Sequence, residues 1–182
     1  MPDAVEANLE VVRRIPDIMA WLANFGIARE SEAEAKGRGQ NGTKGAAKGG
    51  AETNALLPTA EVDSLPPLVL AYVGDAVYEL CVRTALVASG GARVRELHRR
   101  AVGLVRAEAQ AEGLRKLEGF LTPDEETIVR RGRNAKSGMY PRHATVLEYR
   151  HSTGFEALLG VLFLRGELER LKEIFVRLAA DE

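Results

Sequence analysis

Apolar side chains recur at helical spacing through most of this chain, and no alternating segment is long enough to predict a strand. The pattern predicts a first helical segment over residues 5–27, which Pro16 divides into two short helices. Further helices are predicted over residues 64–90, 93–117, 122–131, 144–164 and 168–178. We therefore expect an all-α protein.

Two of the predicted helices have clear start signals. Ser64 is a candidate N-cap for the helix whose first turn holds Pro66 and Pro67. Thr122 and Glu125 have the spacing of a capping box, with Pro123 at the first helical position between them.

The helical period is lost over residues 30–58, and the segment 37–50 has no apolar residue larger than Ala. Such a composition is typical of a flexible chain that cannot bury a core. We therefore divide the chain into an N-terminal helical extension (1–28), a flexible Gly/Ala/Lys-rich linker (29–60) and a main helical domain (61–182).

Composition excludes several classes of protein. With a single cysteine, Cys81, the chain forms no intrachain disulfide and no Cys-based zinc site. No apolar run reaches the roughly 18 residues that a membrane helix needs. The N-terminus is too acidic for a signal or transit peptide. We expect a cytoplasmic protein with no membrane partner.

The net charge of −1 hides an uneven distribution. Residues 91–150 contain 13 Arg or Lys and 8 Asp or Glu, while the rest of the chain is acidic. A locally basic stretch can form a phosphate-binding face, but a solvated helix surface has the same composition.

Two carboxylates interrupt apolar helical segments. Asp75 follows Gly74 between valines, and Glu156 lies among Phe155, Ala157 and leucines. An ionised side chain in such a setting is unfavourable unless it is paired or binds a metal. Carboxylates are preferred ligands of Mg²⁺, which can assist phosphodiester hydrolysis. The alternative is a structural ion pair with an arginine such as Arg83 or Arg150.

Several motifs around these carboxylates carry a family resemblance. Residues 72–80 (YVGDAVYEL) resemble the signature helix of the ribonuclease III endonuclease domain, and residues 155–160 (FEALLG) resemble its second acidic motif. Residues 98–102 (HRRAV), 130–137 (RRGRNAKS) and 149–156 (YRHSTGFE) closely resemble the Mini-ribonuclease III family. The resemblance covers residues 65–171 in the family order.

The resemblance implies an all-helical homodimer with the ribonuclease III endonuclease-domain fold that cleaves double-stranded RNA with Mg²⁺. Mini-type enzymes mature the ends of 23S ribosomal RNA, so the expected partner is pre-23S rRNA, and assistance by a ribosomal protein is left open. Asp75 and Glu156 match the family's catalytic and metal-binding acids. Three other positions that are acidic in full-length ribonuclease III are Leu68, Ala71 and Thr153 here, which leaves the number of metal ions open.

The resemblance also implies where RNA and a second subunit bind. Because no double-stranded-RNA-binding domain follows residue 182, we expect the catalytic domain to hold its own substrate. The candidate RNA-binding residues are Arg131, Arg133, Asn134, Lys136, Arg99 and Arg100. The family dimerises through its signature helix, so the candidate interface residues are Tyr72, Val73, Val77 and Leu80.

Two rival functions remain open on the sequence. One is a non-catalytic RNA-binding or ribosome-assembly protein on the same fold, in which Asp75 and Glu156 are structural. The other is a helical module that binds a protein through its N-terminal helices. Retention of both acidic motifs favours the nuclease.

Overall fold

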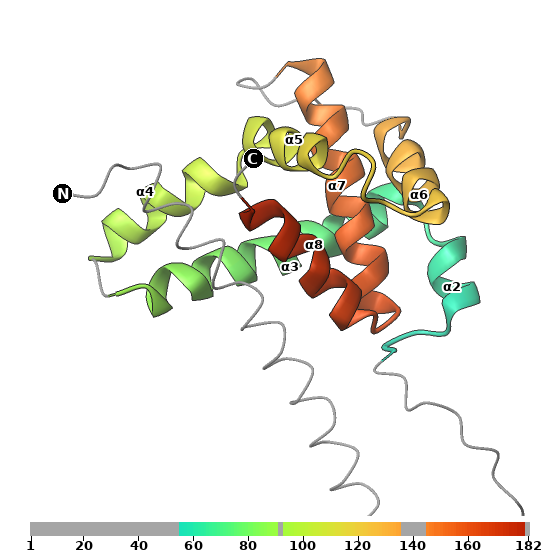
Figure 1. Ribbon diagram of the computed structural model, residues 1–182, viewed down its shortest axis with the longest axis horizontal. Coiled ribbons are helices and arrows are strands. Elements are labelled where there is room, and N and C mark those ends of the chain that lie inside the picture. Colours follow the sequence, from blue (N-terminus) through green and yellow to red (C-terminus); the bar gives the residue numbers. More distant parts are fainter. Residues whose placement is uncertain (1–54, 91–92, 136–144, 181–182) are drawn as a thin grey trace, which may run out of the picture.

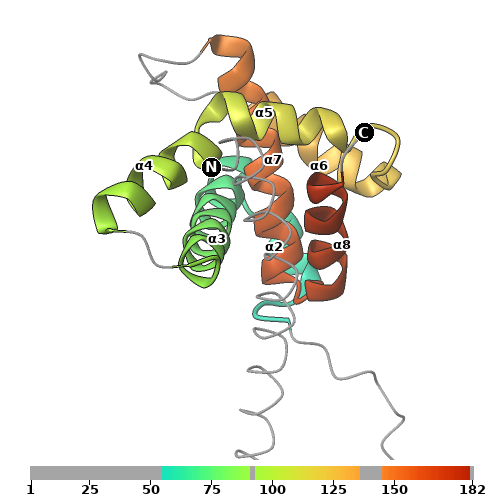
Figure 2. The same ribbon diagram turned by 60° about the vertical axis from the view of Figure 1, so that its left-hand side comes forward.

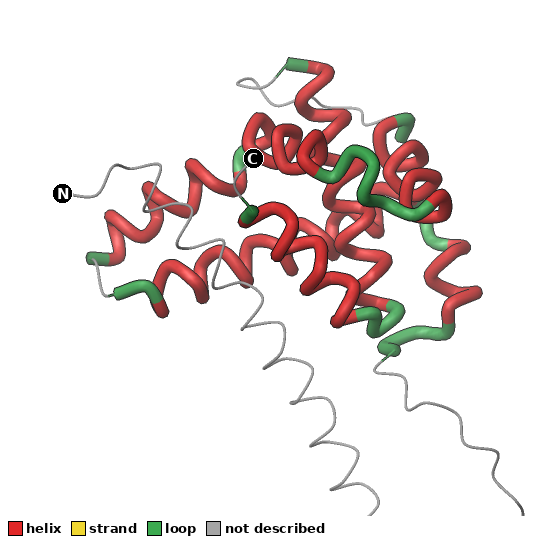
Figure 3. Tube along the Cα trace, in the orientation of Figure 1, coloured by secondary structure: helices red, strands yellow, loops and turns green. Residues whose placement is uncertain are grey.

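The computed structural model describes residues 55–90, 93–135 and 145–180, and every regular element in these ranges is a helix (Figures 1 and 3). The helices are α2 (Thr59–Ser64), α3 (Pro67–Ala88), α4 (Val94–Val105), α5 (Ala107–Lys116), α6 (Pro123–Arg133), α7 (Val146–Leu164) and α8 (Leu168–Ala179). The all-α prediction is confirmed. The predicted extension over residues 1–28 and most of the predicted linker lie outside the described residues.

Helix α7 is the centre of the fold. It packs along α3 and contacts α5, α6 and α8, and the two views in Figures 1 and 2 show it running between these elements. Nearly every residue from Ser152 to Leu162 is buried. A helix enclosed on all sides is apolar on all sides, so a charged residue within this stretch of α7 needs a specific explanation.

Glycines let two helices approach α7 with backbone against backbone. A Cβ atom on Gly74 of α3 would overlap the carbonyl oxygen of Glu156 and lie 2.8 Å from the Gly160 nitrogen. Gly132 of α6 meets α7 in the same way, because its Cβ would lie 2.8 Å from the Gly154 Cα. Any side chain at these positions would force the helices apart.

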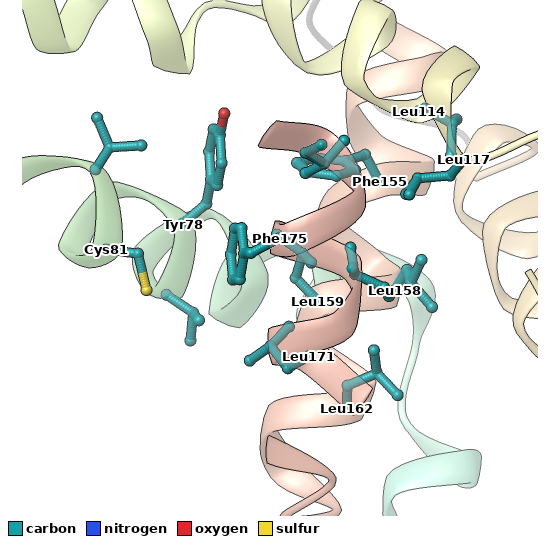
Figure 4. Packing of buried hydrophobic residues seen from close by; sticks show 14 of the residues in the cluster. Tyr78, Cys81, Leu114, Leu117, Phe155, Leu158, Leu159, Leu162, Leu171 and Phe175 are labelled. Carbon is teal, nitrogen blue, oxygen red and sulfur yellow. The ribbon is translucent and has the colours of Figure 1, made fainter. Parts of the chain in front are cut away.

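The main core lies between α3, α7 and α8 (Figure 4). The Tyr78 ring meets the Phe155 ring edge to face at 5.3 Å and stacks on Phe175 at 6.1 Å. Both arrangements are favoured by the aromatic quadrupole. Burial raises the pKa of Tyr78 to about 12, so its hydroxyl stays protonated and donates to the Leu104 carbonyl at 3.4 Å.

The start of the described domain differs from the prediction. Ser64 does not cap α3; it ends the short helix α2, and its Oγ donates to the Glu61 carbonyl. Helix α3 begins at Pro67, with Pro66 as its N-cap residue. Leu56 and Leu57, which we assigned to the linker, donate backbone hydrogen bonds to the Leu164 carbonyl at 3.0 and 3.3 Å. These residues therefore belong to the folded domain.

The predicted helix over residues 93–117 is two helices. Arg106 is extended, with ψ 152°, and separates α4 from α5. The break lets α4 pack on α3 while α5 packs on α7. No Gly or Pro lies at the break, so the helical spacing of apolar residues predicted one continuous helix.

The remaining boundaries follow local chemistry. The capping box of Thr122 and Glu125 is confirmed at the start of α6, and an unpredicted one, of Thr145 and Glu148, starts α7. Gly166 adopts a left-handed φ of 69° that reverses the chain between α7 and α8. None of the described helices combines the length and the apolar character required to cross a bilayer.

Candidate active site

The crossing of α3 and α7 brings Asp75 and Glu156 together. Asp75 follows Gly74, the residue whose backbone faces the Glu156 carbonyl. Asp75 is on the exposed side of α3, whereas Glu156 is largely buried on α7. The sequence predicted this pair, and the backbone contact explains why the glycine precedes the aspartate.

Burial and neighbouring negative charge raise the pKa of both carboxyl groups. The pKa of Glu156 is raised to about 8, first by burial and then by the Asp75 carboxylate. The pKa of Asp75 is also raised, by desolvation and by the nearby Glu79 carboxylate. The ionised form of each carboxyl group is therefore less stable here than in water, and a nearby cation would stabilise it.

No basic side chain in the described part of the chain forms an ion pair with Asp75 or Glu156. Arg83, the candidate structural partner, instead pairs with Glu79 at 2.8 Å. The interpretation of these carboxylates as helix-packing ion pairs is therefore not supported, and Glu79 is engaged elsewhere.

Sequence analysis missed one polar residue of this site, Gln110 on α5. Its side chain is buried, and its amide interacts with both carboxylates and lowers the pKa of each. Its Nε2 donates to the Val105 carbonyl at 3.0 Å, while its buried Oε1 has no partner. The available signal was a long polar side chain among alanines (AEAQAEGL, residues 107–114).

This donor set fits a divalent cation that keeps part of its water shell. The site offers two carboxylates and a buried amide whose oxygen has no hydrogen-bond partner. Mg²⁺ is usually bound in this way, through one or two carboxylates while it keeps several water ligands. Within the described residues no group of three His, Cys, Asp or Glu is placed to hold a metal. Thr153, at a position that is acidic in the larger enzymes, turns its hydroxyl to the Tyr149 carbonyl at 2.9 Å.

Comparison with known proteins decides the family. Residues 68–167 match the Ribonuclease III domain. The chain is 51% identical over 123 residues to the Mini-ribonuclease 3 of Thermoanaerobacter sp. strain X514, covering 68% of this chain and 87% of that protein. The chain belongs to the Mini-ribonuclease 3 family. It is accordingly an endoribonuclease.

Two further comparisons agree. The Mini-ribonuclease 3 of Symbiobacterium thermophilum is 52% identical over 118 residues, which are 65% of this chain and 90% of that protein. A crystal structure of a Fusobacterium nucleatum protein superposes with a TM-score of 0.59 at 29% identity, covering 64% of this chain and 93% of that one.

The candidate RNA-binding residues that the structure describes lie on α4 and at the end of α6. Arg99 is exposed on α4, where it pairs with Glu96 and lines a groove with Arg93, Arg95 and His98. Arg100, the next residue, is half-buried. The outer side of α4 is thus strongly basic.

The second surface surrounds the end of α6. Arg131 turns its guanidinium toward the backbone carbonyls of Asp63 and Leu65 at 3.4 to 3.5 Å, so it also holds the α2–α3 connection. Asn134 is the exposed C-cap residue of α6. Lys136 lies outside the described residues.

Arg133 lines a different hollow, a pocket of about 300 Å³ between α5, α6 and α7. Arg115, Arg130 and His151 share its rim, and leucines form much of its floor. Desolvation and the neighbouring Arg133 and Arg115 lower the pKa of His151. Glu118 and Glu126 also line this pocket, so its three arginines leave only a small excess of positive charge.

The candidate interface residues do not share one environment. Tyr72 is 80% exposed and Leu80 is 53% exposed, and they continue a row of exposed apolar side chains that includes Leu68 and Val69. Val73 is half-buried. Val77 is 7% exposed and belongs to the core, so it lies beneath this surface.

Cys81 is not a nucleophile. It is fully buried, and burial raises the pKa of its thiol to about 12, so no thiolate forms at neutral pH.

Proposed function

We propose that this Mini-ribonuclease 3 family member is a Mg²⁺-dependent endoribonuclease that cleaves double-stranded RNA at Asp75 and Glu156. The observation that carries the proposal is the convergence of two carboxylates, free of any basic partner in the described chain, at the α3–α7 crossing. When bound, the cation would stabilise charge on the phosphate oxygens and activate water.

The chain's own residues have distinct parts in this proposal. Asp75, on the exposed side, faces the incoming phosphodiester, and Glu156 supplies a second carboxylate from within the fold. Burial raises the pKa of Glu156 and so disfavours its ionised form, which a nearby cation would stabilise. The site is therefore suited to assemble with cation and phosphate together.

RNA binding is proposed to use Arg99 and Arg100 on α4 and Arg131, Arg133, Asn134 and Lys136 around the end of α6. Duplex RNA is recognised mainly through its shape, phosphates and 2′-hydroxyl groups, and these cationic and amide groups suit such contacts. The proposal extends to Arg115 and Arg130, which share the pocket of Arg133.

We also propose a homodimer formed through the outer face of α3, with Tyr72 and Leu80 in contact with the partner and Val73 at its edge. Large apolar side chains exposed in a row on one helix are typical of an interface. Two copies would present two sites, each cutting one strand.

The finer biological role is proposed from the family resemblance. It is the maturation of 23S ribosomal RNA ends in the cytoplasm, assisted by a ribosomal protein. Cleavage of a pre-23S end-stem duplex, with and without total ribosomal proteins, tests this role against an unrelated duplex of the same length.

The central experiment compares cleavage of a duplex RNA by wild type, Asp75→Asn and Glu156→Gln as Mg²⁺ is varied. We expect the loss of either carboxylate to reduce the rate by about 100-fold or more, the equivalent of several kcal/mol of transition-state stabilisation. Glu79→Gln is the matched control, because Glu79 is an acid on the same helix that pairs with Arg83. Equal losses in all three variants would contradict the assignment.

A further inference from the structure

The pocket between α5, α6 and α7 combines an apolar floor with a charged rim. Leu114, Leu117 and Val129 of the floor are buried, and arginines and glutamates line the rim. Sites for small ligands are mostly apolar and carry a few polar groups that fix the orientation of the ligand. The lining of this pocket, whose volume is about 300 Å³, therefore favours a small group with an apolar face and a polar edge.

Several charged groups of the rim are available to a ligand. Neither Glu118 nor Glu126 forms an ion pair within the described residues, although arginines line the same pocket. Arg133 also has no ion pair there, and its stem lies against α7, where a Cβ placed on Gly154 would be 2.8 Å from its Cγ. The other two arginines of the rim bond to side chains of their own helices.

This mixture of charges suits a nucleobase better than a phosphate group. Glu118 and Glu126 repel an anion, whereas a base has an uncharged π-face and an edge of hydrogen-bond donors and acceptors. Guanine matches both kinds of rim group. Its O6 and N7 accept a two-pronged contact from arginine, and its N1–H and N2–H₂ groups donate to a carboxylate.

Only an unpaired base could enter the pocket. Side chains cannot read the deep major groove of duplex RNA, and sequence-specific recognition uses bases splayed out of loops, bulges and ends. His151 on the pocket wall precedes Glu156 by five residues of α7. That separation is about 7.5 Å along a helix axis and about 140° around it. The base in the pocket would therefore flank the cleaved bond and not belong to it.

We propose that this pocket binds an unpaired guanine of the RNA substrate, with Arg133 donating to O6 and N7 and with Glu118 and Glu126 as acceptors for N1–H and N2–H₂. The inference rests on the proposed function in one respect, because it takes RNA as the substrate. It adds a determinant of specificity, since an RNA duplex with an unpaired guanine near the cut is preferred to a fully paired one.

The first test measures binding of the full-length protein in EDTA to duplex RNAs that differ in one unpaired nucleotide. The cut is first mapped on the fully paired duplex with Mg²⁺, and a bulged G, A or U is then placed at successive positions on either side of it. At one position we expect the guanine bulge to bind about tenfold more tightly than the uracil bulge. Lack of a guanine preference at every position would overturn the inference and leave the proposed function standing. Absence of binding and cleavage for all duplexes would overturn both.

The second test removes both acceptors in the double variant Glu118→Ala, Glu126→Ala. The guanine preference should disappear, while affinity for the fully paired duplex should stay the same or rise, because two negative charges near the RNA are lost. Equal gains for all RNAs, with the preference kept, would mean that the glutamates act only through their charge and would overturn the inference. Glu108→Ala is the matched control, because Glu108 is an exposed acid of α5 that pairs with Arg106 outside the pocket.

The third test locates the base and its source. Spectra of the ¹⁵N-labelled protein with guanine-bulged and uracil-bulged duplexes should differ at the backbone amides of Glu118 and Arg133. A guanine preference without such a difference would place recognition elsewhere and overturn the inference. GMP is the second probe, and tighter binding of GMP than of the guanine-bulged duplex would identify a free nucleotide as the ligand and overturn the assignment to RNA.

Discussion

Glu156 shows how one residue can combine a functional demand with a penalty for folding. Its pKa of about 8 lies well above the ordinary glutamate value of 4.5, so the folded metal-free protein retains a proton that the unfolded chain releases. Between these two values the folded state binds more protons, and its stability falls as the pH rises.

We therefore predict that the melting temperature of the metal-free protein falls between about pH 5 and pH 8, and that Glu156→Gln flattens this dependence. Thermal melts in EDTA over this range measure it. Glu169→Gln, an exposed acid on α8, is the control and should leave the slope unchanged. A slope that survives in Glu156→Gln would contradict the prediction.

The same carboxyl group, Glu156, should make cation affinity rise with pH, whereas the stability of the metal-free protein falls. Because a ligand carboxylate must lose its proton before it binds, Mn²⁺ affinity is expected to increase from pH 6 to pH 8. Calorimetric titrations at several pH values check this, with buffers of different ionisation enthalpy to count the released proton. No proton release on binding at pH 7 would argue against Glu156 as a ligand.

At the scale of elements, α3 and α7 meet backbone to backbone at Gly74 and also pack through side chains such as Tyr78 and Phe155. Gly74→Ala would place a methyl group against the Glu156 carbonyl, so we predict destabilisation of at least about 1–3 kcal/mol together with loss of cleavage. Denaturant unfolding and the RNA assay measure the two effects.

Gly103→Ala is the matched control for this substitution. Gly103 is also within a helix, α4, but nothing lies within 4 Å of a Cβ placed there. This change should stabilise the protein by up to about 1 kcal/mol, since alanine has the higher helix propensity. Similar destabilisation of both variants would contradict the prediction, because only the methyl group at position 74 would meet the backbone of α7.

Arg170 of helix α8 binds Glu125 at the start of α6. Arg170 makes a two-pronged contact with the buried Glu125, at 2.8 and 2.9 Å, and donates to the Phe120 carbonyl at 3.1 Å. Burial alone would raise the pKa of Glu125, but Arg170 and the Thr122 cap lower it overall. The carboxylate thus contributes stability above its unfolded pKa and loses it as the pH falls.

Arg170→Met should accordingly destabilise the domain by about 3 kcal/mol at neutral pH, because it leaves a buried carboxylate without its partner. Guanidinium unfolding measures this. The difference from wild type should shrink as the pH falls through the lowered pKa of Glu125, because the protonated carboxyl no longer needs the arginine. Lys172→Met, on the exposed side of the same helix, is the control and should have little effect.

Sequence reasoning succeeded where a local signal specified the structure. The capping box at Thr122 and the acidic pair of Asp75 and Glu156 are both readable from residue type and spacing. It failed at Ser64 and at Arg106, where tertiary packing against α3 and α7 decided the boundaries. Gln110 was missed because its burial comes from packing between helices, which no spacing within α5 reveals.

At the scale of the whole molecule, the outer face of α3 carries a row of exposed apolar side chains, which is the proposed dimer interface. If it forms the proposed dimer, Tyr72→Lys should place a charge in the interface and produce monomers. Light scattering at several concentrations measures this. Val87→Lys, an exposed valine near the far end of α3, is the comparison. A dimer that persists in Tyr72→Lys would show that the interface does not include Tyr72.

The glycine crossings also bear on how such an enzyme can be altered. The separation of α3 from α7 at the site is set by main-chain atoms in contact, and the leucines of the core fill space around that contact without defining it. We therefore expect substitutions of core residues, including those made for thermal stability, to leave the distance between the two carboxylates unchanged. For protein engineering, the four glycines at positions 74, 132, 154 and 160 are the ones to leave untouched.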